Sequence, residues 1–533
     1  MFDIMVKNGK VIDGTGKPAF FADIGIKDGR IAAIAPQLDA GQAEVIDAEG
    51  KTVTPGFIDY HSHSDSSFIY GTDAYNYLEQ GVTTQITGHC GSGPVPYYDG
   101  LLDDAKRFLS PEEWQAVRDF CDDFETFSRK VETMSLGTNM AFYASQGNIR
   151  GRVMGFRPDT PSEQEMQEME KLMAQAMECG FLGFTTGLVY APSVYAGTEE
   201  LVRLARVAAR YGGSYTSHIR GEGDTVVQSV EEAIEIGRRA GVPVIISHLK
   251  VLGKKNEGRS EEVLRVIEQA NREGVFVRAD QYPFIAGSAP MVSQIPPKYL
   301  TGGVAALMEQ LTDPALRERI RYSVFHETGE FESGFYQAGY EGCLIAESAM
   351  TPQHVGKTLA QLGEEWGCDG LDAACRLLRE NNGFVQGIYF SQNQSDMQRI
   401  IAHPYVMGGS DWSDYSEHFP RDKRVGGHPR GTGTFTRRIE LVRDQGLLTP
   451  EQVIHSMTGL PAEVSGLEGI GVLREGARAD LCVLDYDNVR CNADFDFPFR
   501  KNDGVETVLV GGAVAVRGGE ATGVKNGAFL RRK

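Results

Sequence analysis

The stretch that decides the expected fold is residues 213–250, GSYTSHIRGEGDTVVQSVEEAIEIGRRAGVPVIISHLK. It opens with an apolar, strand-forming segment, continues with apolar side chains at helical spacing, and closes with a second apolar segment. A strand, a helix and another strand in this order predict two parallel strands joined by a crossover helix. Because both strands then end at the same edge, His218 and His248 are expected to lie there together.

The same strand–helix unit recurs through the middle of the chain. Further strand candidates are residues 53–60, 83–90, 139–147, 181–190, 275–284 and 405–411, and helical spacing is clear in SEQEMQEMEKLMAQAMEC, EELVRLARVAARYG and SEEVLRVIEQANREG. The strand count reaches about eight, which favours a (β/α)8 TIM-like barrel. The alternative is an open doubly wound sheet, but no G-x-G-x-x-G follows the first strand.

The two ends of the chain have a different pattern, with short alternating strands and turn residues. NG in residues 8–9 and DG in residues 28–29 predict hairpin turns near the N-terminus, and ETVLVGGAVAVRGGEAT continues the style near the C-terminus. We expect residues 1–54 and 468–533 to form one small β-sandwich domain and residues 55–467 to form the catalytic barrel. Exposed strand edges of the small domain could pair between subunits into a homo-oligomer.

Residues 285–350 interrupt the strand–helix alternation. PPKYLTGG, LTDPALRER and ETGEFESGFYQAGYEG are rich in proline, glycine and aromatic residues. A long irregular excursion from a barrel is commonly a lid or a pocket wall. We therefore predict an insertion with that role.

Composition excludes several classes of partner. The 533 residues carry a formal net charge of −20 without a basic cluster, which argues against nucleic acid and against an anionic membrane surface. No long apolar run predicts a transmembrane helix, and the N-terminal residues do not resemble a signal peptide. The eight cysteines include no C-x-x-C pair and do not form a disulfide framework, so a cytoplasmic protein is expected.

Side chains that can bind a metal follow several of the predicted strands. His61 and His63 follow the first strand, Cys90 the second, and Asp411 the last, in addition to His218 and His248. Each could be structural on its own, but their convergence on one barrel edge predicts a site for Zn²⁺ or a similar ion. Such an ion lowers the pKa of its water, and Asp411 could carry the water's proton to a leaving nitrogen.

The combination of PGFIDYHSHSD, HC-G, SHIR, SHLK, DQYP and GGSD between two β-rich ends resembles the amidohydrolase superfamily. More narrowly, it is similar to the D-aminoacylases, or N-acyl-D-amino-acid deacylases, over nearly the whole chain. The resemblance implies zinc-dependent hydrolysis of the amide of an N-acyl-D-amino acid, a small-molecule substrate. It implies one tight zinc held by Cys90, His218 and His248, and a weaker second metal position held by His61, His63 and Asp411.

The resemblance also implies roles around the substrate. Lys250 and Arg430 would bind its carboxylate, Tyr282 would donate a hydrogen bond to the developing oxyanion, and Ser288 would line the pocket. Arg220, on the face of His218, would either support the site or contact the substrate.

The sequence departs from the family around the thiol, where GHCG stands in place of the usual GNCG. His89 is expected to point away from Cys90 and not to bind metal, and His418 could lie in the pocket or in a solvated loop. Three functions stay open: the linear deacylase, a hydrolase of cyclic amides or N-carbamoyl compounds or a deaminase on the same metal site, and a non-catalytic scaffold. The acyl group, the side chain accepted and the number of metals are not encoded.

Overall fold

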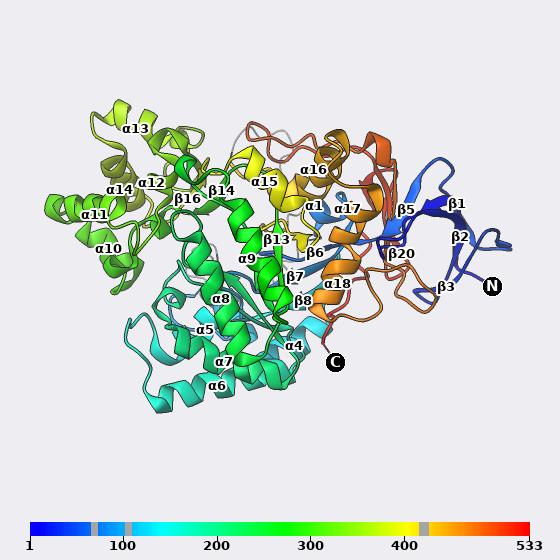
Figure 1. The fold of residues 1–533 in the computed structure, drawn as a ribbon, viewed down its shortest axis with the longest axis horizontal. Helices are drawn as coiled ribbons and strands as arrows, with labels where there is room; N and C mark the ends of the chain where they lie inside the picture. The colour runs from blue at the N-terminus through cyan, green and yellow to red at the C-terminus, as the bar shows by residue number, and fades with distance from the viewer. Residues whose placement is uncertain (66–72, 102–108, 415–425, 533) are drawn as a thin grey trace.

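The computed structural model describes residues 1–65, 73–101, 109–414 and 426–532. Its centre is a ring of parallel strands, with the small β domain at one end and the inserted segment at the other (Figure 1). The strands of the ring are β6 (Phe57–Asp59), β7 (Val82–Thr87), β8 (Asn139–Phe142) continued by β9 (Ala144–Ser145), β10 (Gly183–Gly187), β11 (Ser214–His218), β12 (Val244–Ile246), β13 (Val277–Gln281) and β17 (Val406–Gly408).

The ring closes by hydrogen bonds between its first and last strands. The order β6-β7-β8 continues through β9 into β10, β11, β12, β13 and β17, with every pairing parallel. The Tyr60 N–H donates to the Gly408 carbonyl at 3.2 Å, and Ser62 bridges to Trp412 in parallel. This confirms the predicted barrel, whose strand ends form one edge.

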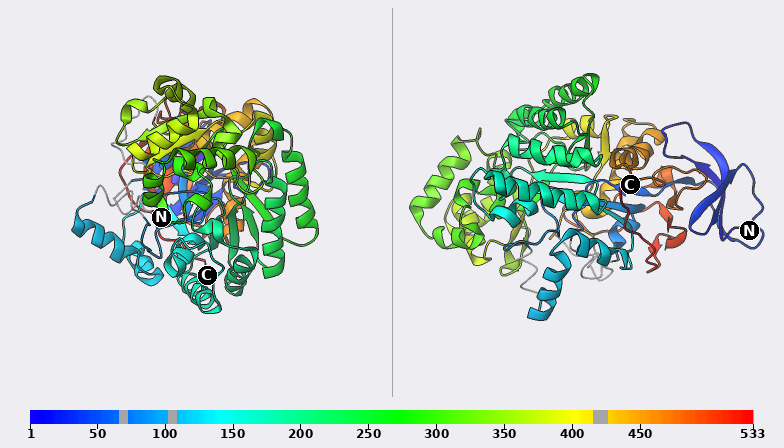
Figure 2. Two further views of the ribbon diagram at one scale, coloured as in Figure 1. Left: turned by 90° about the vertical axis from the view of Figure 1, so that its left-hand side faces the viewer. Right: turned by 90° about the horizontal axis from the view of Figure 1, so that it is seen from below.

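Helices cover the outside of the barrel, as Figure 2 shows from two further directions. The four predicted helices are α6 (Glu163–Glu178), α7 (Thr198–Arg210), α8 (Val226–Ala240) and α9 (Ser260–Arg272). The others around the barrel are α1 (Tyr75–Leu78), α4 (Phe124–Glu132), α5 (Gln146–Met154), α15 (Gln394–Ile401), α16 (Arg430–Asp444), α17 (Pro450–Met457) and α18 (Gly459–Ser465), and α3 (Pro111–Cys121) contacts α4. Among the described residues, each helix is too short or too polar to span a bilayer.

Both chain ends contribute to one nine-stranded sheet. Its strands are β1 (Ile4–Val11), β2 (Phe20–Lys27), β3 (Arg30–Ala35), β4 (Glu44–Asp47), β5 (Thr52–Pro55), β18 (Leu481–Leu484), β19 (Val505–Val510), β20 (Ala513–Arg517) and β21 (Glu520–Ala521). N-terminal Ile24 and Val53 share a core with C-terminal Leu481 and Leu509, so the sheet folds around a common interior. The domain boundaries and the pairing of subunits stay predictions.

The two turn signals near the N-terminus have different outcomes. Asp28 and Gly29, both at positive φ, join β2 to β3 as predicted. The prediction of a hairpin turn at Asn8–Gly9 is wrong, because β1 runs through it with a bulge between Val6 and Gly9. A glycine-containing bulge also accepts positive φ, so the dipeptide alone does not distinguish the two structures.

The inserted segment has its own secondary structure and core. Strands β14 (Gly287–Pro290), β15 (Cys343–Ser348) and β16 (Val385–Tyr389) form an antiparallel sheet, and the helices are α10 (Gly303–Gln310), α11 (Pro314–His326), α12 (Gly334–Ala338), α13 (Leu359–Trp366) and α14 (Gly370–Glu380). The segment is therefore not the irregular excursion expected from its composition. Its sheet is completed by β16, beyond residue 350.

Candidate active site

A cavity of about 530 Å³ opens at the carboxyl edge of the barrel. Its lining includes His63, Cys90, His218, His248 and Asp411. The sequence predicted each of these residues to follow a different strand. We call these five residues and the adjacent His61 the rim. The opposite lining comes from residues 287–391 of the inserted segment, which we call the wall.

The rim residues stand mostly in the turns that follow the strands. β7 ends at Thr87, β12 at Ile246 and β17 at Gly408, so Cys90, His248 and Asp411 lie two or three residues further on. These three have φ of 53°, 33° and 53°. A left-handed conformation costs a non-glycine residue about 1–2 kcal/mol, and such outliers concentrate at functional sites. The expected convergence is therefore achieved by turn geometry instead of strand alternation.

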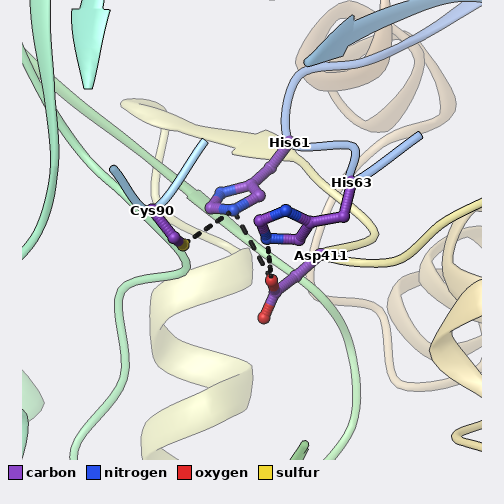
Figure 3. Close-up of side chains that lie close together, drawn as sticks. All are labelled: His61, His63, Cys90 and Asp411. Carbon is purple, nitrogen blue, oxygen red and sulfur yellow. Dashed lines mark hydrogen bonds and ion pairs between the residues drawn. The ribbon is translucent and has the colours of Figure 1, made fainter. Parts of the chain in front are cut away.

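The rim forms two groups of donors that share one sulfur atom. His61, His63, Cys90 and Asp411 form one group and Cys90, His218 and His248 the other, each with its ligand atoms within 4.8 Å of one another. Cys90 Sγ lies 3.4 Å from His61 Nε2 and 3.4 Å from His248 Nε2. In the first group the four side chains point toward a common centre (Figure 3).

Carboxylate groups contact the Nδ1 atoms of three of the histidine rings. Asp280 Oδ1 lies 3.0 Å from His61 Nδ1, and Asp65 Oδ2 lies 3.2 Å from His63 Nδ1. Glu222 Oε1 lies 3.1 Å from His248 Nδ1. A carboxylate that accepts from Nδ1–H leaves the Nε2 lone pair free for a cation, the arrangement that supports histidine ligands.

Lys250 competes with Glu222 for His248. Its Nζ lies 2.6 Å from Glu222 Oε1 and 2.6 Å from His248 Nδ1. If the ammonium donates to Nδ1, the ring proton sits on Nε2, which then cannot bind metal. If Glu222 accepts from Nδ1–H, Nε2 is available. Metal binding at His248 therefore favours the Glu222 contact and releases Lys250 from the ring.

The protonation of the rim fits a cation site. Burial lowers the pKa of His61, His218 and His248 well below the ordinary value, so these rings are neutral and keep a lone pair. The buried Nδ1 of His218 has no hydrogen-bond partner. Burial raises the pKa of the Cys90 thiol to about 11, so a bound cation is what would make it a thiolate.

His63 and Asp411 form the most polar part of the rim. His63 Nε2 lies 3.1 Å from Asp411 Oδ1 and His61 Nε2 lies 3.5 Å from the same oxygen. Burial works to lower the pKa of His63, but its bonds to Asp411 and Asp65 outweigh this and raise it well above the ordinary value. A cation between His63 and Asp411 would take the place of that proton.

Arg430 binds the other oxygen of Asp411. Its guanidinium donates to Asp411 Oδ2 at 2.6 Å and to the Ser288 carbonyl at 3.3 Å. Burial works to raise the pKa of Asp411, but Arg430 and the nearby histidines hold it well below the ordinary range. The buried Nε of Arg430 has no hydrogen-bond partner. That N–H is available to an anionic group of a ligand.

Tyr282 and Ser288 also line the cavity, whereas Arg220 does not. The Tyr282 hydroxyl accepts from Gln392 Nε2 at 3.1 Å, so its own proton is free to donate. Ser288 Oγ donates to the Gly387 carbonyl at 3.1 Å within the wall. Arg220 instead donates to Glu232 and to the carbonyls of Val194 and Ala196, beside a loop that lines the cavity.

The two histidines of undecided role have different outcomes. His89 is buried and its ring stacks on His61 at a centroid distance of 4.1 Å, belonging to neither donor group. Burial lowers its pKa well below the ordinary value, so it packs as a neutral ring. His418 lies outside the described residues.

The chain matches the family described as Amidohydrolase family over residues 44–270 and 369–516. It is 35% identical to the N-acyl-D-glutamate deacylase of Alcaligenes xylosoxydans xylosoxydans, covering 96% of this chain and 93% of that one. The chain belongs to the amidohydrolase family. Its similarity to the D-aminoacylase of the same organism is 32% identity over 100% of this chain and 98% of the other.

Among solved structures, this amidohydrolase resembles the N-acyl-D-glutamate deacylase from Bordetella bronchiseptica complexed with zinc and a phosphonate inhibitor. The TM-score is 0.81 at 34% identity, with 99% of each chain covered. Zinc in a similar protein agrees with the donor set of the rim. The resemblance inferred from the sequence motifs is thereby confirmed.

Two functional candidates were missed in the sequence. Asp280 Oδ1 accepts from His61 Nδ1 and from the His248 N–H at 2.9 Å, which ties two rim histidines together. It is the next-to-last residue of β13, within DQYP, so the strand-end rule could have found it. Glu222 lies four residues after His218, beyond the strand, and no sequence rule indicates that it contacts His248 and Lys250.

Proposed function

We propose that this chain is a zinc-dependent deacylase that hydrolyses N-acyl-D-amino acids to a carboxylate and a free D-amino acid. The observation that carries the proposal is the convergence in one cavity of zinc donors with two buried cations, Lys250 and Arg430. Cations beside a metal favour a substrate that carries a free carboxylate next to the scissile amide. The D configuration rests on the names of the full-length relatives.

Zinc would be held by Cys90, His218 and His248, and a second, weaker ion by His61, His63 and Asp411 with Cys90 shared. When bound, zinc supplies Lewis acidity that makes water nucleophilic near neutral pH and polarises the acyl carbonyl. The donor sets support this assignment because thiolate, neutral imidazole and carboxylate are zinc ligands.

The side chains around the rim then handle protons and charge. Asp411 accepts a proton from the attacking water and delivers it to the departing nitrogen, and its low pKa keeps it ionised for the first step. The Tyr282 hydroxyl donates to the oxyanion. Lys250 and the free N–H of Arg430 hold the substrate's carboxylate, which orients the amide.

Other residues act at a distance in this proposal. Ser288 shapes the pocket, and Arg220 supports the loop of Val194 and Ala196 by its hydrogen bonds. Asp280 and Glu222 fix the rings of the ligand histidines. A cytoplasmic location stays a prediction from the eight free cysteines.

A substrate panel tests the proposal. Zinc-loaded enzyme should hydrolyse N-acetyl-D-amino acids, with little or no turnover of L-isomers, hydantoins, N-carbamoyl compounds or aminopurines. Faster turnover of a hydantoin or an aminopurine would favour the cyclic-amide hydrolase or deaminase. Less than about half an equivalent of zinc with no activity after reconstitution would favour a non-catalytic scaffold.

A further inference from the structure

A buried histidine, His428, lies directly behind Arg430 and belongs to neither donor group of the rim. It stands in GGHPRGTG, just before α16 begins at Arg430, and its side chain is 0% exposed. A buried polar atom is costly unless it has a hydrogen-bond partner. The partners of the two ring nitrogens therefore show what this histidine does.

Both ring nitrogens of His428 have partners on the polypeptide backbone. The Arg430 N–H donates to Nδ1 at 3.0 Å, and Nε2–H donates to the Ala286 carbonyl at 2.9 Å. Because a backbone N–H only donates and a carbonyl only accepts, the two bonds require the neutral ring with its proton on Nε2. Burial lowers the pKa of His428 well below the ordinary value, which agrees with the neutral form.

The bond to Nδ1 caps the first turn of α16. The N–H groups at the start of a helix have no partner within the helix. Arg430 is the first residue of α16, and Pro429 at the N-cap provides no side-chain acceptor. His428 supplies that acceptor, and its own carbonyl accepts from the Gly431 N–H at 3.3 Å. The backbone that carries the Arg430 side chain is therefore held by His428.

The bond to Ala286 connects the start of α16 to the segment that enters β14 of the wall. Two residues further on, the Ser288 carbonyl accepts from the Arg430 guanidinium at 3.3 Å. Residues 286–288 and 428–430 are thus joined twice, once through the histidine and once through the arginine. Both ends of Arg430, its backbone and its guanidinium, are fixed to the same neighbouring segment.

His428 also contacts the two aromatic rings that flank the guanidinium. Arg430 Cζ lies 4.8 Å from the ring centre of Tyr282 and 5.3 Å from that of Trp412. The ring centre of His428 lies 6.0 Å and 6.2 Å from the same two centres. Arg430, Tyr282 and Trp412 line the cavity, whereas His428 is not among the described residues that do. It therefore supports the lining from behind.

We propose that His428 is a positioning residue that holds the guanidinium of Arg430 in place for the substrate's carboxylate. This rests on the proposed function, in which Arg430 binds that carboxylate. A guanidinium recognises a carboxylate through directional bonds, so a displacement of its backbone weakens the interaction without removing the charge. His428 affects the binding and orientation of the substrate and does not touch the substrate itself.

The test compares two substrates that differ only in the group that Arg430 binds. We measure kcat/KM of the zinc-loaded, full-length enzyme, from acetate release, for the N-acetyl-D-amino acid that wild type cleaves fastest and for its carboxamide. His428→Ala should lower the ratio of acid to carboxamide by about tenfold or more, with unchanged zinc content. An unchanged ratio in the folded, zinc-loaded variant would overturn the inference. Wild-type enzyme that cleaves no N-acetyl-D-amino acid would remove the proposed function itself.

A second arm tests whether His428 acts through Arg430. In an Arg430→Lys background, His428→Ala should change kcat/KM for the acid by less than about threefold, because the guanidinium that it positions is already gone. Losses that multiply in the double variant would show that the histidine acts independently of the arginine, and would contradict the proposal.

Conservative variants separate the two bonds of His428. His428→Asn keeps an acceptor near the place of Nδ1 for the Arg430 N–H, and His428→Gln keeps a donor near the place of Nε2 for Ala286. Each should lower the ratio by less than His428→Ala. His354→Ala is the matched control, because His354 is buried in the wall beside Trp366 and is not among the described residues that line the cavity.

The remaining outcomes decide the proposal as well. An equal fall of the ratio in His354→Ala would show a general effect of losing a buried histidine, and would contradict a positioning role of His428. If His428→Ala does not fold, wild-type ratios in both conservative variants would overturn the inference.

Discussion

The rim is assembled from the ends of five barrel strands, whereas the wall comes from one continuous segment with its own sheet and core. Apart from the half-buried His63, the rim side chains are buried: His61 is 0% exposed and His248 2%. Carboxylates contact three of the histidine rings. The wall presents an exposed carboxylate and aromatic faces. This difference suggests that the rim determines the reaction and the wall the choice of substrate.

The largest effect is expected at the atom shared by both donor groups. Cys90→Ala should abolish tight zinc binding and with it hydrolysis, because the remaining histidines lose their common anionic ligand. Elemental analysis after gel filtration should give less than about half an equivalent of zinc. Cys482→Ala removes another fully buried thiol, in the small domain, and should leave zinc content unchanged. Stoichiometric zinc in Cys90→Ala would remove Cys90 from the ligand set.

A substitution at Asp411 tests whether this residue transfers protons without being required for tight zinc binding. Asp411→Ala should keep the fold and the tight zinc while kcat falls by about 10²–10⁴, the usual contribution of general acid–base catalysis. Circular dichroism and zinc analysis provide the controls. Near-normal turnover would discard the proton-transfer role.

A substitution at Glu222 tests the role of the carboxylates that contact the rim histidines. Glu222→Gln should weaken zinc binding by about 10–100-fold, because the amide no longer favours the tautomer of His248 that binds metal. Competition with a chromophoric chelator measures this without reference to activity. Glu232→Gln changes a carboxylate that accepts from Arg220 and Thr198 and contacts no rim histidine, so it should leave zinc affinity unchanged. Equal zinc affinities in Glu222→Gln and wild type would show that His248 is oriented without this carboxylate.

The smallest effect is expected on the wall, at Ser288. Ser288→Ala removes the Oγ hydrogen bonds to Gly387 and Gln386 but keeps the carbonyl that accepts from Arg430. The loss in kcat/KM should be about 1 kcal/mol or less, a factor of about five. A loss of hundredfold or more in steady-state kinetics, with intact zinc content, would place Ser288 among the reacting groups.

The sequence predicted the rim better than the wall for a physical reason. A metal-binding side chain directly after an apolar strand indicates convergence once the strands are parallel, so His218, His248 and Asp411 could be placed without knowing the turns. In the wall, the proline- and glycine-rich composition obscured helix signals such as Asp313, which caps α11, and Pro314 at its first position. The role of Glu222 could not be predicted, because its contact with His248 joins two separate turns and has no local sequence signature.

X-ray absorption at the zinc edge of the loaded wild-type enzyme tests the central claim most directly. The account predicts a sulfur scatterer at about 2.3 Å together with nitrogen and oxygen neighbours, since Cys90 and the rim histidines share the ion. A zinc shell of nitrogen and oxygen alone, in enzyme that is fully active, would contradict it.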